Sequence, residues 1–493
     1  MIRISKLFNY ILILFLVFTI IGCGNTGGSG QQTEKYETLK VISVNDVHGT
    51  IEESSDNYGF AGLSWYVNNE RSKDGQAVLV LAAGDMFQGT AIANYTYGEN
   101  VIKLMNTIGF DAMTIGNHEF DWGLDTVLEY VDGKKDNGEA DFPFLACNLI
   151  EKSTNKIPEN VEAYTVVDYK QFQVGVIGYI GPGIESDISA SYVEDYEFVD
   201  PVDYISQLSH ELRTEKGCDM VIVMGHADNS SLNTRIAELK GDHAVDMLVN
   251  GHSHATYTKT LRNGNNKMIP VVQSGSAGDS LTDTEFQLNG TNDIFGEGLA
   301  TTVDLGGYDI LSDKKVADMV KQMANEIAPI MGEELGVAGR NVTKTTVGYW
   351  SASAILNHVK CDLAAINTGG IRAYAFPIEE GTSITVKKMY EIMPFDNFIK
   401  TCKLTGDKLK AVLNINDLFL SENVIKNGIE WYINGEKIDN NKVYTFACVD
   451  YLFDRDEEIY GEGTDIIFTG KLMRDIMIEQ LRIDSKNNLP WLN

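Results

Sequence analysis

The stretch Gly116-Asn117-His118-Glu119-Phe120-Asp121 combines side chains whose types and spacing suit metal binding and proton transfer. An Asn side chain offers a neutral oxygen to a metal ion, and a His side chain can donate a proton to a leaving oxygen. Asp121 follows His118 by three residues and is expected to orient its imidazole, as carboxylates commonly do. The apolar run 112–115 precedes the stretch, so we expect these side chains just past the carboxyl end of a buried strand.

Four further apolar runs in the N-terminal half end in the same kinds of residue. They cover residues 41–44, 78–81, 220–224 and 247–249. Each is followed by Asp, Asn or His, usually beside a glycine that allows a tight turn of the backbone. All the strand ends together carry Asp46, His48, Asp85, Asn117, His118, His226, His252 and His254. The segments 99–108 and 202–214 have the spacing of amphipathic helices, which predicts an α/β fold.

The distribution of histidines strengthens this interpretation. Five of the eight histidines of the chain lie at these strand ends. A lone histidine is more often a structural residue than a ligand, but five at equivalent positions, joined by Asp46, Asp85 and Asn117, are hard to explain structurally. The other three histidines are interpreted as surface or structural residues. The sequence therefore predicts metal-type ligands along one edge of an α/β sheet.

The first residues have the pattern of a secretion signal. Arg3 and Lys6 precede an uncharged apolar run over residues 11–21, which is too short to span a bilayer comfortably. The ending Ile20-Ile21-Gly22-Cys23 resembles a bacterial lipobox, in which the cysteine is lipidated and becomes the mature N-terminus. An ordinary signal peptide cut elsewhere is the alternative. Residues 24–34 are rich in Gly and polar residues and are expected to tether an extracytoplasmic body to the membrane.

Composition limits the kinds of partner. With 493 residues, 43% of them hydrophobic and 22% charged, the chain is long enough for more than one globular core. The formal charge of −30 becomes −32 when Arg3 and Lys6 leave with the signal, which argues against nucleic acid as a partner. An acidic protein can still bind an anionic substrate if metal ions reverse the local field. Besides Cys23, five cysteines remain, and their positions show neither a disulfide framework nor a Cys-x-x-Cys pattern.

The order and spacing of the motifs resemble a known family. Asp-x-His, Gly-Asp, Gly-Asn-His-Glu-Phe-Asp, Gly-His and Gly-His-x-His resemble the calcineurin-like metallophosphoesterases. The form of residues 116–123 further resembles the 5′-nucleotidase branch, which includes UDP-sugar hydrolases and 2′,3′-cyclic-nucleotide phosphodiesterases. The resemblance implies an N-terminal β-sandwich flanked by helices (αββα), a linker helix, and a C-terminal α+β substrate domain.

The resemblance also implies roles for the strand-end residues. One divalent metal ion would be held by Asp46, His48 and His254, and a second by Asn117, His226 and His252, with Asp85 bridging the two. His118 and Asp121 would match the catalytic dyad of the family. Two ions about 3.5–4 Å apart can stabilise the entering and leaving oxygens of an in-line phosphoryl displacement. Nitrogen and oxygen ligands without thiolate suit Zn, Mn, Fe or Co, and the sequence does not choose among them.

The C-terminal half resembles the nucleotidase substrate domain in three stretches. The loop at residues 367–372 implies substrate contacts by Asn367 and Arg372, and the turn at 393–397 implies that Phe395 stacks on a base. Tyr451 aligns loosely with a second stacking aromatic, although Phe395 and Tyr451 could instead be core residues. The glycine-rich loop expected after Tyr451 is replaced by residues 453–458, which leaves Asp465 as a candidate for its acidic residue.

A change of pattern near residue 310 marks a boundary between two bodies. Ser312 is the expected N-cap of a connecting helix and Gly332 its expected end. The expected segments are a signal peptide (1–22), a lipidated Cys23 with its tether (23–36), a catalytic domain (37–308), a linker helix (309–336) and a substrate-recognition domain (337–493).

The sequence thus predicts a membrane-anchored dinuclear-metal phosphohydrolase that acts on nucleoside 5′-monophosphates outside the cytoplasm. One alternative is a phosphodiesterase or pyrophosphatase acting on cyclic nucleotides or UDP-sugars. Another is a surface nucleotide-binding lipoprotein without turnover, which the complete set of metal-type ligands and the dyad speak against. No protein partner is identifiable from the sequence.

The lipobox-like ending predicts the effect of Cys23→Ser. Without the thiol that carries the lipid, the chain should lose lipid attachment and be released in a soluble or unprocessed form. Metabolic labelling with a fatty acid, followed by membrane fractionation, measures both effects. A processed variant that stays as firmly bound to the membrane as the parent would show that the attachment lies elsewhere.

Overall fold

The computed structural model describes residues 36–492, apart from residues 55–56, 58, 135–137, 289–294, 308, 416 and 456–462. The predicted signal peptide, Cys23 and the tether up to residue 35 lie outside the described residues. Across the described ranges, no helix combines the length and the hydrophobicity that a membrane-spanning segment needs. All five cysteines within these ranges are free thiols.

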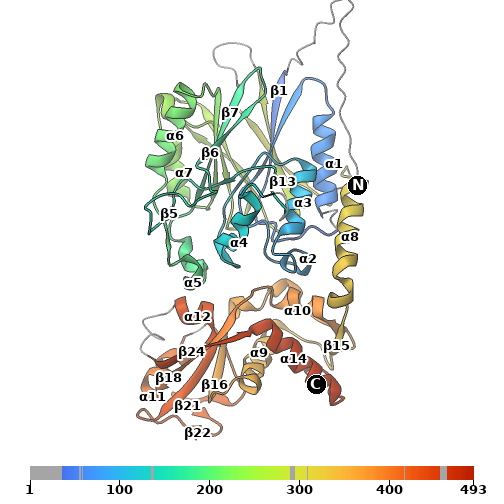
Figure 1. The fold of residues 1–493 in the computed structure, drawn as a ribbon, viewed down its shortest axis with the longest axis vertical. Helices are drawn as coiled ribbons and strands as arrows, with labels where there is room; N and C mark the ends of the chain where they lie inside the picture. Colours follow the sequence, from blue (N-terminus) through green and yellow to red (C-terminus); the bar gives the residue numbers. More distant parts are fainter. Residues whose placement is uncertain are drawn as a thin grey trace, which may run out of the picture. The chain divides into compact units, whose positions relative to one another are not determined.

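Two six-stranded sheets form the N-terminal domain (Figure 1). The first has the order β14 (Leu299–Asp304), β13 (Ser280–Gln287), β1 (Thr38–Val44), β2 (Gln76–Ala82), β3 (Ala112–Thr114), β4 (Phe144–Leu145). The second has the order β11 (Thr256–Arg262), β12 (Met268–Ser274), β10 (Met247–Asn250), β9 (Met220–His226), β7 (Gln173–Ile180), β6 (Tyr164–Asp168). Strands β1 to β4 run parallel, as do β7, β9, β10 and β12, and the antiparallel strands lie toward the edges. A separate ribbon pairs β5 (Leu149–Glu151) with β8 (Tyr196–Phe198).

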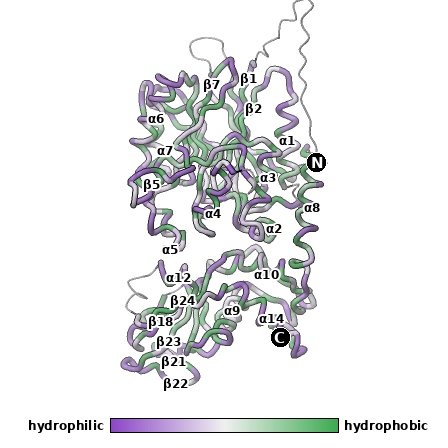
Figure 2. Tube along the Cα trace, viewed as in Figure 1, coloured by the Kyte–Doolittle hydropathy of each residue, from purple (hydrophilic) through white to green (hydrophobic). Residues whose placement is uncertain are grey.

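The sheets pack face to face because their strands are apolar on both sides. Leu39 and Val41 of β1 belong to a cluster shared with the second sheet, whereas Ile42 and Val44 belong to the cluster that includes the surrounding helices. This alternation follows the two-residue period of a strand, and burial on both faces is typical of parallel sheets. Figure 2 shows hydrophobic segments along the inner strands and hydrophilic segments mainly on the outside of the domain.

Helices cover the outer faces of both sheets, which confirms the αββα arrangement. Those of the N-terminal domain are α1 (Gly59–Arg71), α2 (Ala91–Asn94), α3 (Glu99–Ile108), α4 (Leu124–Leu128), α5 (Ala190–Val193), α6 (Val202–Thr214) and α7 (Ser230–Ala237). Helices α1 and α3 lie beside the first sheet, and α6 packs on β7 and β9 of the second (Figure 1). The helices predicted over 99–108 and 202–214 are α3 and α6.

Because the strands run parallel, the predicted ligands that follow them lie together at the carboxyl ends of the strands. In the first sheet Val44 of β1 is paired with Ala82 of β2, which is paired with Met113 of β3. In the second sheet Asn250 of β10 is paired with Gly225 of β9. The strand-end pattern alone predicts one sheet edge, whereas the structure divides these strands between two sheets whose carboxyl ends meet.

The C-terminal domain is an α+β body built on a five-stranded sheet. Its sheet order is β19 (Leu418–Leu420), β16 (Leu363–Asn367), β23 (Val443–Val449), β18 (Phe398–Thr405), β24 (Thr464–Leu472). Smaller pairings join β15 (Glu334–Val337) to β17 (Ser383–Thr385), and β20 (Val424–Asn427) to β21 (Glu430–Ile433) and β22 (Glu436–Lys437). Its helices are α9 (Lys344–His358), α10 (Val386–Ile392), α11 (Gly406–Leu413), α12 (Asp450–Arg455) and α14 (Met473–Lys486).

Helix α8 (Lys314–Met331) connects the two domains and packs on α1, α2, α3 and α10. Its N-cap is Asp313 rather than the predicted Ser312, and Gly332 ends it as predicted. The Asp313 carboxylate accepts hydrogen bonds from the backbone N–H groups of Lys315 and Val316, and also from Ser64 and Asn68 of α1. The cap is therefore selected by contacts with α1, which local sequence does not reveal.

Asp313→Ala should destabilise the docking of α8, because it removes the cap and both bonds to α1. The expected loss in free energy of unfolding is about 0.5–2 kcal/mol, measured by urea denaturation. Ser312→Ala is the matched control and should change little, since Ser312 is exposed. Equal losses in the two variants would contradict the assignment of the cap.

Candidate active site

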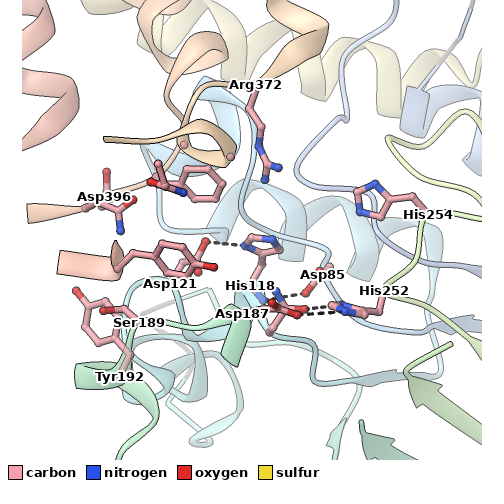
Figure 3. A pocket seen from close by; sticks show the side chains of 17 residues that line it. Asp85, His118, Asp121, Asp187, Ser189, Tyr192, His252, His254, Arg372 and Asp396 are labelled. Atoms are coloured by element: carbon pink, nitrogen blue, oxygen red, sulfur yellow. Dashed lines mark hydrogen bonds and ion pairs between the residues drawn. The ribbon is translucent and has the colours of Figure 1, made fainter. Parts of the chain in front are cut away.

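A cavity of about 250 Å³ lies where the strand ends meet residues of the C-terminal domain. Its walls include Asp85, Asn117, His118, Asp121, His252, His254, Asn367, Arg372, Phe395 and Tyr451. Figure 3 shows Arg372 pointing into the cavity from one side, towards His118 on the other. Asp46, His48 and His226 are not part of its walls but contact residues that are. The structure thus brings together the residues predicted as metal ligands, dyad and substrate contacts, but not Asp465.

Asp46, His48 and His254 form one group of converging ligand atoms. His48 Nε2 lies 3.0 Å from His254 Nε2, and His254 Nε2 lies 3.6 Å from Asp46 Oδ1. Burial and the neighbouring His118 hold the pKa of His48 well below its usual range, and burial also lowers the pKa of His254. Both imidazoles are therefore neutral, as metal ligands must be.

Asp85, Asn117, His226 and His252 form the second group. His226 Nε2 lies 3.2 Å from Asp85 Oδ2 and 3.1 Å from Asn117 Oδ1, while His252 Nδ1 lies 3.0 Å from the same Asn117 oxygen. Against the effect of burial, His226 holds the pKa of Asp85 well below its usual range, and Asp85 raises the pKa of His226 to about 10. The buried Asp85 carboxylate therefore attracts positive charge to this position.

The second nitrogen of each imidazole supports the fit of a metal ion. His48 Nδ1 lies 3.1 Å from the carbonyl oxygen of Gln88, and His226 Nδ1 lies 2.8 Å from that of Ala83. Each Nδ1 can therefore carry a proton and donate, so Nε2 can offer its lone pair to a metal ion, which in His226 would displace the proton that Asp85 favours. Histidines that ligate metals are commonly oriented by a donated hydrogen bond of this kind.

Five of the predicted ligands have a left-handed backbone. The φ angles are +50° for Asp46, +51° for His48, +55° for Asp85, +79° for His252 and +59° for His254. This conformation is uncommon outside glycine and clusters at functional sites, where the surrounding structure enforces it. It results from the sharp turns that follow the strands and aims these side chains at one point.

Two glycines allow the strand ends to approach one another closely. A Cβ atom on Gly84 would lie 2.5 Å from His226 Nδ1, and one on Gly116 would lie 2.3 Å from Asp85 Oδ1. Neither position has room for a side chain. The Gly-Asp and Gly-Asn-His motifs therefore contain glycine for steric reasons.

The predicted dyad is formed in the structure. His118 Nδ1 lies 2.8 Å from Asp121 Oδ2, and the backbone N–H of His118 donates to Asp85 Oδ1 at 2.8 Å. Burial acts to lower the pKa of His118, but Asp121 and Asp85 raise it to about 9. His118 is therefore protonated at neutral pH and can act as a proton donor.

Glu119 is a buried residue that sequence reasoning did not assign. Its carboxylate accepts hydrogen bonds from the backbone N–H groups of Asp85, Met86 and Gly116. Burial and the nearby Asp85 carboxylate raise the pKa of Glu119 to about 7. Glu119 thus joins the loop after β2 to the loop after β3 and sets the position of Asp85 against the dyad. The position of Glu119 next to His118 in the motif is the sequence feature that could have indicated its role.

The substrate residues predicted for the C-terminal domain occupy the opposite wall. Phe395 stacks on His118 with ring centroids 5.9 Å apart and planes at 23°, while the Arg372 guanidinium lies 4.4 Å from the Phe395 centroid. A base could stack on Phe395 only if Arg372 or His118 moved aside. Asn367 Oδ1 is buried and has no hydrogen-bond partner among the described residues, so it can accept a bond from a ligand.

Some wall residues have no motif that would have revealed them, namely Asp187, Ser189 and Tyr192 from the segment around α5. Asp396 and Asn397 also line the cavity, and they belong to the turn at 393–397 that the sequence singled out without giving them a role. Asp187 Oδ2 lies 3.4 Å from His252 Nε2, opposite the nitrogen that faces Asn117. Asp465, the candidate replacement for an acidic residue, instead pairs with Lys403 at 2.5 Å and is not part of the cavity.

Known families match both domains. A family profile described as calcineurin-like phosphoesterase matches residues 39–256, and one described as the C-terminal domain of 5′-nucleotidase matches residues 323–428. Both descriptions agree with the resemblance seen in the motifs.

Individual proteins are similar over most of the chain. A 5′-nucleotidase of Vibrio cholerae is 25% identical over 453 residues, covering 81% of this chain and 79% of its own length. An endonuclease of Bacillus subtilis is 25% identical over 423 residues, or 79% of this chain, but the match spans only 34% of that protein. The crystal structure of a 5′-nucleotidase precursor from Thermus thermophilus shares the fold, with a TM-score of 0.73, 20% identity, and coverage of 90% of this chain and 96% of that one.

The His118–Asp121 pair predicts a shift in pH dependence for Asp121→Asn. The carboxylate stabilises the protonated imidazole, so its loss should lower the pKa of His118. Because a proton donor is inactive once deprotonated, the alkaline limb of the kcat profile on a phosphate ester should move to lower pH. Profiles of parent and variant at equal metal content measure the shift, and an unmoved limb would show that Asp121 does not control the proton.

Proposed function

Because the chain belongs to the calcineurin-like metallophosphoesterases of the 5′-nucleotidase family, which are metal-dependent phosphoester hydrolases, we propose that it converts nucleoside 5′-monophosphates to nucleoside and phosphate. The observation that carries the proposal is the single cavity that joins metal-type ligands, the His118–Asp121 pair and Arg372. If the phosphate of the substrate lies at the strand ends, its nucleoside points toward the C-terminal domain.

The proposed metal sites follow the two groups of ligand atoms. Asp46, His48 and His254 would hold one divalent ion, and Asn117, His226 and His252 would hold the other, with Asp85 as a shared ligand. The lone pairs that converge there, and the positive charge that Asp85 attracts, fit such ions. When bound, the ions supply charge that polarises the phosphoryl group and offsets the charge that develops in the transition state.

His118 is proposed to donate a proton to the leaving oxygen. Asp121 holds Nδ1, which leaves Nε2 as the donor toward the cavity. The raised pKa of His118 keeps this proton in place at neutral pH. Positioned donors of this kind are what phosphoryl transfer requires of the protein, since the reaction depends mainly on orientation and charge.

The C-terminal wall is proposed to recognise the nucleotide. Arg372 can make a charge-assisted bond to the phosphate, and the free Asn367 Oδ1 can accept a bond from a sugar hydroxyl or a base N–H group. Phe395 and Tyr451 are the proposed stacking aromatics, with Phe395 becoming available once Arg372 turns to the phosphate. Phosphodiester or pyrophosphate substrates remain the second candidate, because one similar protein is an endonuclease.

We further propose that the enzyme is a lipoprotein outside the cytoplasmic membrane. The support is the N-terminal sequence, where a charged start, an apolar run and Cys23 precede a polar tether. The catalytic body then begins at β1, directly after the tether.

A substrate panel tests the proposed activity. The enzyme, prepared with and without added Mn²⁺, is assayed on AMP, a 2′,3′-cyclic nucleotide and UDP-glucose. The highest kcat/KM is expected for AMP, and all activity should depend on the metal. A higher kcat/KM for the cyclic nucleotide would indicate a phosphodiesterase, and a higher kcat/KM for UDP-glucose would indicate a pyrophosphatase. No turnover of any substrate at full metal loading would contradict an enzymatic role.

Two substitutions should separate proton donation from metal binding. Asp85→Ala should lose metal and activity together, because it removes the shared ligand. His118→Ala should keep its metal but lose about 10²–10⁴-fold in kcat, the range for a positioned proton donor. Metal analysis alongside turnover distinguishes them. Two tightly held ions in Asp85→Ala, or metal loss with unchanged turnover per remaining ion in His118→Ala, would show the roles to be wrong.

A further inference from the structure

The carboxylate of Asp396 lies at a contact between the two domains. Trp122, the residue after Asp121 in the catalytic domain, donates its indole N–H to Asp396 Oδ2 at 3.1 Å. The other oxygen, Oδ1, accepts a hydrogen bond from Arg474 at the start of α14. One carboxylate therefore connects the loop that carries the dyad to a helix of the C-terminal domain. Figure 3 shows Asp396 at the cavity, on the same side as Arg372.

Arg474 makes this connection stiff. Its side chain is buried, and Nη1 donates to the carbonyl oxygens of Met393, Pro394 and Phe395 at 3.2, 2.9 and 3.3 Å. The arginine thus holds the backbone of the turn that carries Phe395. A buried guanidinium is stable only when its charge is paired, and Asp396 is the carboxylate that pairs it.

The catalytic domain holds the same turn from the other side. The buried Asn94 donates to the carbonyl oxygen of Pro394 at 2.7 Å, and Trp122 is almost fully buried against Tyr97, with ring centroids 5.6 Å apart. These contacts fix where Phe395 lies relative to His118. The ring stack of Phe395 on His118 is therefore a consequence of how this turn is held.

We infer that Asp396 is a positioning residue, which couples Trp122 to Arg474 and so holds Phe395 against the imidazole of His118. The stack lies beside one face of the ring and limits its rotation, while Asp121 fixes Nδ1. The orientation of the proton donor is then set only when the C-terminal domain is in place. The inference rests on the proposed role of His118 and assigns Asp396 no contact with the reacting atoms.

Trp122→Phe is the main test, because it removes the indole N–H and keeps an aromatic, though smaller, ring. Asp396→Asn is the second, since an amide cannot accept from both Trp122 and Arg474 while pairing the charge. Each should lower kcat on a small aryl phosphate on the order of tenfold with little change in KM, which corresponds to about 1.4 kcal/mol. The double variant should lose no more than the larger single loss, because both changes break one connection.

A Phe395→Ala background tests whether Asp396 acts through the stack. Adding Asp396→Asn to Phe395→Ala should cause no further loss of kcat. A loss of the same factor in both backgrounds would overturn the inference. Two controls remove matched contacts away from the cavity: Trp431→Phe removes an indole bond to Asn414, and Glu333→Gln breaks an ion pair with Arg482. Both should turn over substrate like the parent.

Hydrogen exchange gives a readout that does not depend on turnover. In Asp396→Asn, exchange should rise both at residues 393–397 and at residues 118–124 of the other domain. A rise confined to 393–397 would mean that Asp396 only stabilises its own domain, and the inference would be wrong. If the parent hydrolysed no phosphate ester, the proposed function would fail, but the exchange data would still decide whether Asp396 couples the domains.

Discussion

The arrangement of the site depends on one buried pair of side chains, Asp85 and His226, where two sheets meet. Asp85 follows a strand of the first sheet and His226 ends a strand of the second, and their side chains lie 3.2 Å apart with almost no exposure to water. An unpaired charge in such a place would be strongly unfavourable, so both sheets must be present and aligned for the pair to be stable. The position of His118 depends on it, since the backbone N–H of His118 donates to Asp85.

The loops that carry the site are held by hydrogen bonds from backbone N–H groups to buried carboxylates. Glu119 accepts three N–H groups from two loops, and Asp46 accepts the N–H of His252 across the two sheets. These bonds can maintain the left-handed turns that would otherwise relax. The same turns fix the directions of the ligand side chains, as the proposed site for two neighbouring ions requires.

In the proposed function, the C-terminal domain contributes to proton donation as well as to nucleotide recognition. The ring of Phe395 stacks on that of His118, and the Arg372 guanidinium lies over the ring of Phe395. Under this proposal, substrate binding would affect the proton donor, because a ligand that draws Arg372 away also changes the surroundings of Phe395. A catalytic domain without its partner would keep its ligands but lose this stack on the proton donor.

The sequence by itself determined the features that depend on local pattern. Helices α3 and α6, the end of α8 at Gly332 and the residue types at the strand ends follow from periodicity, turn residues and motif spacing. The division of the strands between two sheets is not local, and the family resemblance was needed to predict it. Only the tertiary structure decided that Asp313 caps α8, that Glu119 joins two loops, and that Asp396 meets Trp122. Each of these contacts joins segments that are distant in the chain or follow different strands, so the packing of sheets and domains creates them and no periodicity records them.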